Sequence, residues 1–289
     1  MKYAVSSWIY ADEPFGEIFN RLSRFGYDGI ELVGEPERIS VREIRTLLQS
    51  TNLKVSSILT WCIWGIPGRD MASPEREERE AALLYGKRCI DLAVDIGASI
   101  VVVLPAPAGR TAPVGNPKNP QLWKKARDLE WKLAVESIHK LAEYAHTSKI
   151  TLALEPINRY ETYLVTDVQS ALMFLKDVGA PNLKLHLDTF HMNIEEANLN
   201  GAIQQAGDLL INMHISDSNR QPPGKGHTDF SALFYALKEV NYQGFLVLEP
   251  VPSGSDPLLM VNIPENIDLR DTFAQQSIQY LKQIERQLA

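Results

Sequence analysis

The chain has few cysteines and no excess of basic charge. Its 289 residues include two cysteines, Cys62 and Cys89, whose positions fit neither a disulfide framework nor a metal-binding cysteine cluster. Both are therefore expected to be buried thiols, and a reducing, cytoplasmic location is expected. The formal net charge of -7 argues against a nucleic-acid-binding protein, because phosphate contacts require a basic face.

Long apolar runs and nucleotide-binding motifs are also missing. No run approaches the roughly 18 apolar residues of a spanning helix, and MKYAVSSW at the N-terminus has no apolar stretch behind basic residues. Neither membrane insertion nor export is expected. No Gly-x-Gly-x-x-Gly follows the first expected strand, which weakens a doubly wound, dinucleotide-binding sheet as the alternative fold. These absences favour an enzyme that acts on small molecules.

Short apolar runs alternate with longer amphipathic runs along the whole chain. Strands are expected at residues 2–7, 29–33, 54–59, 99–104, 150–155, 183–188, 209–215 and 245–249. Helices are expected at residues 14–25, 41–50, 74–96, 122–147, 168–178, 194–206, 230–240 and 271–287. This alternation predicts a single (β/α)8 TIM barrel that forms one domain over residues 1–289.

The longest irregular stretch is residues 105–120, after the fourth expected strand. It contains five prolines and two glycines, which exclude a regular helix or strand over most of its length. Long loops in compact domains are commonly functional, so this one is interpreted as a lid or a subunit-contact loop and not as a domain boundary.

Four polar residues lie at the C-terminal ends of four successive expected strands. They are Glu155, Asp188, His214 and Glu249. Each alone is typical of a capped loop or an ion pair, but the strand ends of such a barrel converge on one mouth. Three carboxylates gathered there without a cation would repel one another and raise their pKa values. The set therefore predicts one divalent cation, with Mn²⁺, Mg²⁺ or Co²⁺ suited to these hard ligands.

Further polar and aromatic residues follow the same strand ends. Glu161 and His191 come shortly after the fifth and sixth strands, and Arg220 lies in the stretch after the seventh. Arg220 is suited either to hydrogen-bonding a substrate hydroxyl or to balancing the acids. Glu31 ends the second strand, and no function is predicted for it. Trp8 follows the first strand and is interpreted as an apolar wall for a sugar ring or as a packing residue.

The segments LALEPINRYE, KLHLDTFHM, MHISDSNR and FLVLEP resemble the ketose 3-epimerases, the D-tagatose and D-allulose 3-epimerase group of the xylose-isomerase-like barrels. The resemblance implies that Glu155, Asp188, His214 and Glu249 hold the metal, most often Mn²⁺, and that the two glutamates act as acid and base. It also implies that Glu161, His191 and Arg220 contact the oxygens of a small ketose substrate. A homodimer or homotetramer is expected.

The chemistry of C3 epimerisation agrees with these residues. The enzyme must remove a proton beside the C2 carbonyl and return one on the opposite face, so two bases are needed, and Glu155 and Glu249 are the candidates. An aldose-ketose isomerase, or an inosose- or hydroxypyruvate-type enzyme, would use the same barrel and metal. A metal-dependent phosphodiesterase requires a more basic surface. A sugar-binding protein without catalysis is the remaining alternative.

Overall fold

The computed structural model describes residues 1–288, and its strands form a closed barrel in the order β1-β2-β3-β4-β5-β6-β7-β8. The strand bounds are β1 Lys2–Ser6, β2 Gly29–Gly34, β3 Lys54–Thr60, β4 Ile100–Val103, β5 Thr151–Leu154, β6 Leu183–Asp188, β7 Leu210–Ile215 and β8 Phe245–Leu248. The neighbouring pairs whose register is defined are parallel, and β8 pairs with β1. The expected (β/α)8 fold class is confirmed.

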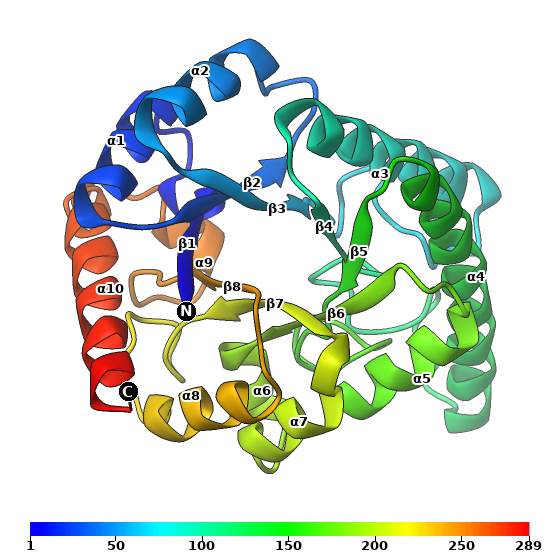
Figure 1. The fold of residues 1–289 in the computed structure, drawn as a ribbon. Coiled ribbons are helices and arrows are strands. Elements are labelled where there is room, and N and C mark those ends of the chain that lie inside the picture. Colours follow the sequence, from blue (N-terminus) through cyan, green and yellow to red (C-terminus); the bar gives the residue numbers. More distant parts are fainter. Residues whose placement is uncertain (289) are drawn as a thin grey trace. The chain divides into compact units, whose positions relative to one another are not determined.

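Helices follow the strands around the chain (Figure 1). The α-helices are α1 Phe15–Phe25, α2 Val41–Thr51, α3 Arg76–Ile96, α4 Pro120–Thr147, α5 Val168–Val178, α6 Thr189–Glu195, α7 Leu199–Ala206, α8 Phe230–Glu239, α9 Pro257–Met260 and α10 Leu269–Gln287. Three 3₁₀ turns are η1 Ser7–Tyr10, η2 Gly207–Leu209 and η3 Pro264–Asn266.

The expected helix at residues 194–206 is wrong at its start. The chain forms α6 directly after β6, breaks, and begins again at Leu199. The break has a local cause, because the Asn198 side chain accepts a hydrogen bond from the Gly201 N–H at 3.1 Å and so caps α7. His191 therefore lies on a helix that begins at the end of β6, and not in a loop.

Capping residues explain why other helices begin and end where they do. Asp167 and Ser170 form a reciprocal capping box at the start of α5. Asn119 caps α4, whose first residue is Pro120, a position that tolerates proline because its N–H has no helical partner. Gly26 ends α1 with φ 76°, a left-handed conformation that glycine adopts without the steric cost of a Cβ.

The chain divides into two compact units, and each is described by itself. The first unit comprises Met1–Val33, Ile39–Ser57 and Leu187–Ala289, and the second comprises Gly34–Arg38 and Ile58–His186. The division falls inside β2, β3 and β6. The interpretation of residues 1–289 as one domain stays a prediction.

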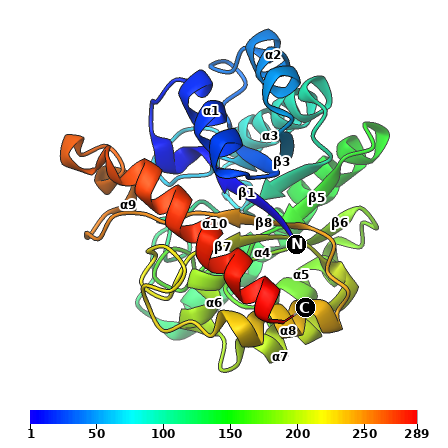
Figure 2. The same cartoon turned by 60° about the vertical axis from the view of Figure 1, so that its left-hand side comes forward.

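In the first unit, β1 lies between β2 and β8, and β7 pairs with β8. Ala4 lies opposite Gly29 on one side of β1, and Tyr3 lies opposite Leu246 on the other. Helix α10 packs against α1 and α8, and the segment with α9 precedes it (Figure 2). The strands are buried on both faces, as expected for parallel strands covered by helices.

In the second unit, β4 and β5 pair along their whole lengths, and α4 packs against both α3 and α5. The loops that follow β3, β4 and β5 also pair with one another, through parallel bridges between Ile63 and Ala108 and between Arg110 and Thr162. Within residues 1–288, no helix combines the length and the apolar character needed to cross a membrane.

Candidate active site

In the first unit, three of the expected metal ligands lie at the ends of three strands. Asp188 is the last residue of β6, His214 lies near the end of β7, and Glu249 follows the last residue of β8. Each side chain is almost fully buried, with 1% of its residue surface exposed. Because burying charged groups without partners is costly, the contacts of these residues define what the site can do.

Arg220 connects two of these carboxylates. Its Nη1 pairs with the Asp188 carboxylate, and its Nη2 donates to Glu249 Oε2 at 2.7 Å. The guanidinium also lies 4.9 Å from the centre of the Phe190 ring. The Arg220 side chain is 13% exposed, whereas the carboxylates that it pairs with are almost fully buried.

The loop that carries Arg220 is held by the buried carboxylate of Asp217. That carboxylate accepts hydrogen bonds from the backbone N–H groups of Ser218, Gly224 and Thr228, at 2.7 to 3.0 Å. Burial raises the pKa of Asp217, but these backbone donors outweigh it, and the pKa lies below its usual value. Arg220 itself has φ 63°, an unfavourable conformation for a residue with a Cβ, which this fixed loop maintains.

His214 lies between two glutamates. Its Nε2 is 2.9 Å from Glu31 Oε1, and its Nδ1 is 3.3 Å from Glu249 Oε2. Glu31 also accepts a hydrogen bond from Ser57 Oγ at 2.6 Å, and Ser57 in turn accepts one from Asn212 Nδ2 at 3.0 Å. This buried line of side chains fixes the orientation of the imidazole ring, as partners behind a metal-binding histidine commonly do.

The carboxylates of the cluster differ in acidity. The pKa of Glu249 is raised to about 7, mainly by burial; the charges of Asp188 and Glu31 also raise it, and His214 and Arg220 oppose the rise. Asp188 is also buried, yet its electrostatic interactions with Arg220, His191 and His214 place its pKa well below the usual value. A carboxyl group that titrates near neutrality is suited to accept and return protons.

Trp8 and His191 complete the surroundings of the two carboxylates. Trp8 Nε1 donates to Glu249 Oε1 at 2.5 Å, and His191 Nε2 lies 3.6 Å from Asp188 Oδ2. The His191 ring meets the Phe190 ring edge to face. Aromatic surface and hydrogen-bonding groups therefore lie side by side, an arrangement typical of sites that bind small polar ligands.

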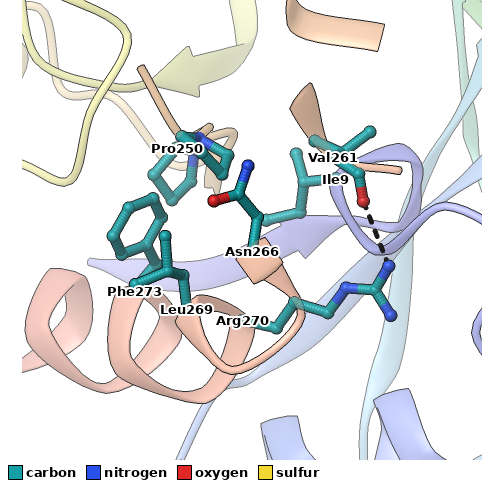
Figure 3. A pocket seen from close by; sticks show the side chains of 8 residues that line it. Ile9, Pro250, Val261, Asn266, Leu269, Arg270 and Phe273 are labelled. Atoms are coloured by element: carbon teal, nitrogen blue, oxygen red, sulfur yellow. Dashed lines mark hydrogen bonds between the residues drawn. The ribbon is translucent and has the colours of Figure 1, made fainter. Parts of the chain in front are cut away.

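The first unit also contains a small pocket, and two of its lining residues, Ile9 and Pro250, follow Trp8 and Glu249 in the sequence. Figure 3 shows Ile9 and Pro250 at this pocket together with Asn266 and Arg270, whose guanidinium donates to the Val261 carbonyl at 3.2 Å. Its volume of about 10 Å³ is that of a single water molecule. It is too small for a sugar.

In the second unit, Glu155 follows the last residue of β5 and is 4% exposed. His186 on β6 places its Nε2 3.7 Å from Glu155 Oε1. Glu161 lies in the loop after β5, where its Oε1 accepts a hydrogen bond from Asn158 Nδ2 at 2.8 Å and its carbonyl accepts one from Gly109 N–H at 2.8 Å. Glu161 is therefore hydrogen-bonded by neighbours from its own unit, and Glu155 lies beside His186 of the same unit.

The structure thus brings Asp188, His191, His214, Arg220 and Glu249 together in the first unit. Sequence reasoning missed the partners that orient them. Glu31 carried the same strand-terminal signal as the chosen residues, but the sequence offered no reason to pair it with His214. Trp8 was interpreted as an apolar wall or a packing residue, and its indole N–H is a hydrogen-bond donor to Glu249.

The first unit offers a donor set for a cation. Glu31, His214 and Glu249 each have one ligand-type atom within 4.8 Å of the others, and all three are buried. A donor set of one imidazole and carboxylate oxygens is suited to a divalent transition metal. A structural zinc site would instead favour cysteine ligands. Glu31 is an additional donor here, since the expected set consists of Asp188, His214 and Glu249 with Glu155.

Residues 19–284 match the family described as xylose isomerase-like TIM barrel, and the chain belongs to this family. Within the family, the chain groups with the ketose 3-epimerases. It is similar to L-ribulose 3-epimerase of Methylomonas sp. (strain DH-1), with 32% identity over 237 residues that cover 80% of this chain and 76% of that protein. The resemblance to ketose 3-epimerases and the expectation of an isomerase are confirmed.

Two further comparisons bear on the activity. The chain is 29% identical to the 3-dehydro-D-guloside 4-epimerase of Escherichia coli (strain K12) over 261 residues, which cover 89% of this chain and 95% of that protein. A crystal structure of D-allulose 3-epimerase from Methylomonas sp. in complex with D-allulose aligns with a TM-score of 0.83 and 28% identity, covering 98% of this chain and 96% of that one.

Proposed function

We propose that the protein catalyses the metal-dependent epimerisation of a free ketose at C3, through a cis-enediolate of the substrate. The observation that carries this proposal is the buried cluster of Asp188, His214 and Glu249 with Arg220, in a chain that groups with ketose 3-epimerases. The cluster unites ligand-type carboxylates, an oriented imidazole and a fixed cationic hydrogen-bond donor.

One divalent cation, Mn²⁺ before Co²⁺ or Mg²⁺, would be held by Glu155, Asp188, His214 and Glu249. The charges at the cluster support this, because Asp188 and Glu31 raise the pKa of Glu249, and a cation would relieve that excess of negative charge. When bound, the cation would supply Lewis-acid stabilisation of the negative charge that develops on the oxygens of the substrate.

The remaining steps belong to side chains of the chain. Glu249 removes or returns the proton at C3 on one face of the sugar, and Glu155 does so on the other. Trp8 Nε1 holds Glu249 Oε1 at 2.5 Å and so orients the carboxylate for that transfer. Arg220, His191 and Glu161 bind the sugar oxygens and keep C3 within reach of the two bases.

A labelling experiment tests the proposal. The Mn²⁺-loaded protein is incubated in D₂O with D-fructose, D-tagatose, D-allulose and L-ribulose, and the position of deuterium and the new sugar are determined by NMR. We expect deuterium at C3 of the product epimer. Label at C1 instead would indicate an aldose-ketose isomerase, and no exchange with any ketose would contradict the proposal.

The similarity to a 4-epimerase favours a second candidate function, epimerisation beside the carbonyl of a 3-keto sugar. The same two-base chemistry would then act at C4, since a C3 carbonyl acidifies its neighbouring C–H bond as a C2 carbonyl acidifies C3. A 3-keto glycoside in the same D₂O assay separates the two candidates, because label at C4 with none at C3 of the ketoses would favour the second.

The proposal also includes a cytoplasmic location and a homodimer or homotetramer. The cysteine usage supports the location, since both Cys62 and Cys89 are buried free thiols. Light scattering after size-exclusion chromatography tests the assembly, and a monomer at micromolar concentration would contradict it.

A further inference from the structure

The second unit contains a buried ion cluster that the proposed reaction does not use. The Arg110 side chain is 3% exposed and pairs with two buried carboxylates, Asp70 and Glu130. The Tyr163 hydroxyl donates to Glu130 Oε2, the oxygen that also pairs with Arg110. The backbone N–H of Val114 donates to Glu130 Oε1 at 2.7 Å. Both carboxylate oxygens of Glu130 thus have a partner. Among the side chains that these contacts join, the Arg110 guanidinium is the only cation.

The residues of this cluster come from three loops and one helix. Asp70 lies between β3 and α3, Arg110 between β4 and α4, and Tyr163 between β5 and α5, while Glu130 lies on α4. One guanidinium therefore links three loops that follow successive strands. The side chain is covered by aromatic rings, since the guanidinium carbon lies 5.3 Å from the centre of the Trp64 ring and 5.1 Å from that of Tyr163.

The backbone around Arg110 is joined to the loop that carries Glu161. Arg110 and Thr162 form a parallel bridge, and the Gly109 N–H donates to the Glu161 carbonyl at 2.8 Å. Tyr163, two residues beyond Glu161, is tied to the cluster through Glu130. The loop position of Glu161 thus depends on a side-chain link on one side and on backbone hydrogen bonds on the other.

We propose that Arg110 is a positioning residue for ketose binding: it holds the loop after β5 so that Glu161 is fixed where it meets the substrate. This inference rests on the proposed function for the role of Glu161. The alternative is that the cluster only stabilises the fold. A buried ion pair is weak support for that alternative, because a neutral cluster of similar volume is often as stable as the charged one.

Two variants separate positioning from stability. The triple variant Arg110→Met, Asp70→Asn and Glu130→Gln removes all three charges together, and the amide that replaces the Glu130 carboxylate keeps one oxygen that can accept from Val114 or Tyr163. Arg110→Lys keeps the charge but lacks the forked geometry that spans two carboxylates. The matched control is Arg88→Met, which breaks the exposed pair of Arg88 with Glu37 in the same unit.

Steady-state kinetics with the preferred ketose and Mn²⁺ titration calorimetry are the first readouts. Because small misplacements of a binding group are costly, KM should rise by about tenfold or more in both cluster variants, with a smaller change in kcat. Metal affinity should stay at the wild-type value, and the control should match the wild type in every respect. Folded cluster variants with wild-type KM would overturn the inference, and Arg110→Lys decides it if the triple variant does not fold.

Hydrogen exchange measured by mass spectrometry gives a readout that needs no activity. Peptides that contain Gly109 and Thr162 should exchange faster in the cluster variants than in the wild type and the control, while those from α3 should not change. If the wild type epimerises no ketose, the proposed function fails, and the exchange comparison still decides whether Arg110 holds this loop. Unchanged exchange in the folded variants would overturn the inference.

Discussion

Each of the two units contains an arginine that pairs with two buried carboxylates. Arg220 pairs with Asp188 and Glu249 at the strand ends of the first unit, and Arg110 pairs with Asp70 and Glu130 among the loops of the second. The contacts are alike, but the side chain of Arg220 is 13% exposed and that of Arg110 is 3% exposed. Exposure and loop position, and not the ion pairs alone, therefore distinguish a group that can meet a ligand from one that holds the frame.

The two clusters also differ in the pKa of their aspartates. The pKa of Asp70 is raised to about 6, mainly by burial; the charge of Glu130 adds to the rise, and Arg110 opposes it. Asp188 is buried too, but Arg220, His191 and His214 together bring its pKa below the usual value. A buried acid paired with one arginine is thus ionised with difficulty or with ease according to the other charges that face it.

The largest effect should come from neutralising one carboxylate of the Arg220 cluster. Glu249→Gln keeps an oxygen but cannot accept a proton, so kcat should fall by about 10³-fold, within the range that general acid-base groups contribute. The matched change Glu130→Gln in the Arg110 cluster should leave kcat near the wild-type value. Steady-state kinetics of both variants test this, and equal losses of kcat would remove the functional difference between the two clusters.

Arg220→Ala should have the next largest effect. A hydrogen bond from a charged donor to the sugar contributes about 1.5 to 3 kcal/mol, so kcat/KM should fall by about 10- to 100-fold. The metal content should remain intact, because Arg220 donates to carboxylates and offers no ligand to a cation. Elemental analysis of the dialysed protein provides the measurement. Loss of metal would show that Arg220 contributes to metal binding and not to substrate binding alone.

A third change tests what holds His214 between its two glutamates. Glu31→Gln keeps an acceptor for the Nε2–H of His214 but removes the charge, and affinity for Mn²⁺ should weaken by about tenfold or more, as for other partners behind metal ligands. Titration calorimetry measures the affinity. Ser57→Ala is the comparison variant: it removes one hydrogen bond to Glu31 but leaves the carboxylate in place, so the affinity should weaken less than in Glu31→Gln. An unchanged affinity in Glu31→Gln would exclude an orienting role for Glu31.

The smallest effect should be a dependence of stability on pH at the Arg110 cluster. The pKa of Asp70 in the folded protein is about 6, above its ordinary value of 3.8, so the folded state binds more protons between these pH values. The contribution of Asp70 to the free energy of unfolding should therefore fall as pH rises through this window. For Asp188, whose folded pKa is lowered, the sign is opposite, and its contribution is lost as pH falls.

Urea unfolding of the wild type and Asp70→Asn from pH 4 to pH 7 checks this sign. The difference in unfolding free energy between the two proteins should drift in favour of the Asn variant as the pH rises, and should level off above about pH 6. A constant difference across the range would show that Asp70 does not titrate there.

Most of the fold could be predicted from local sequence patterns. The alternation of apolar and amphipathic runs located β6 and α5 at their observed bounds, and other strand ends within a few residues. The helix expected at residues 194–206 failed because Asn198 was not recognised as a cap, and caps depend on a single side chain and not on a repeated pattern.

The sequence by itself determined which polar groups lie at or near the strand ends, because the buried apolar runs stop close to them, and this named Glu155, Asp188, His214 and Glu249. Only the tertiary structure decided their partners. Glu31 and His214 are 183 residues apart, and Arg110 is 40 residues from Asp70. No local pattern predicts contacts at such separations, since they arise when strands and loops close against one another, and those contacts set the acidity and orientation of the groups.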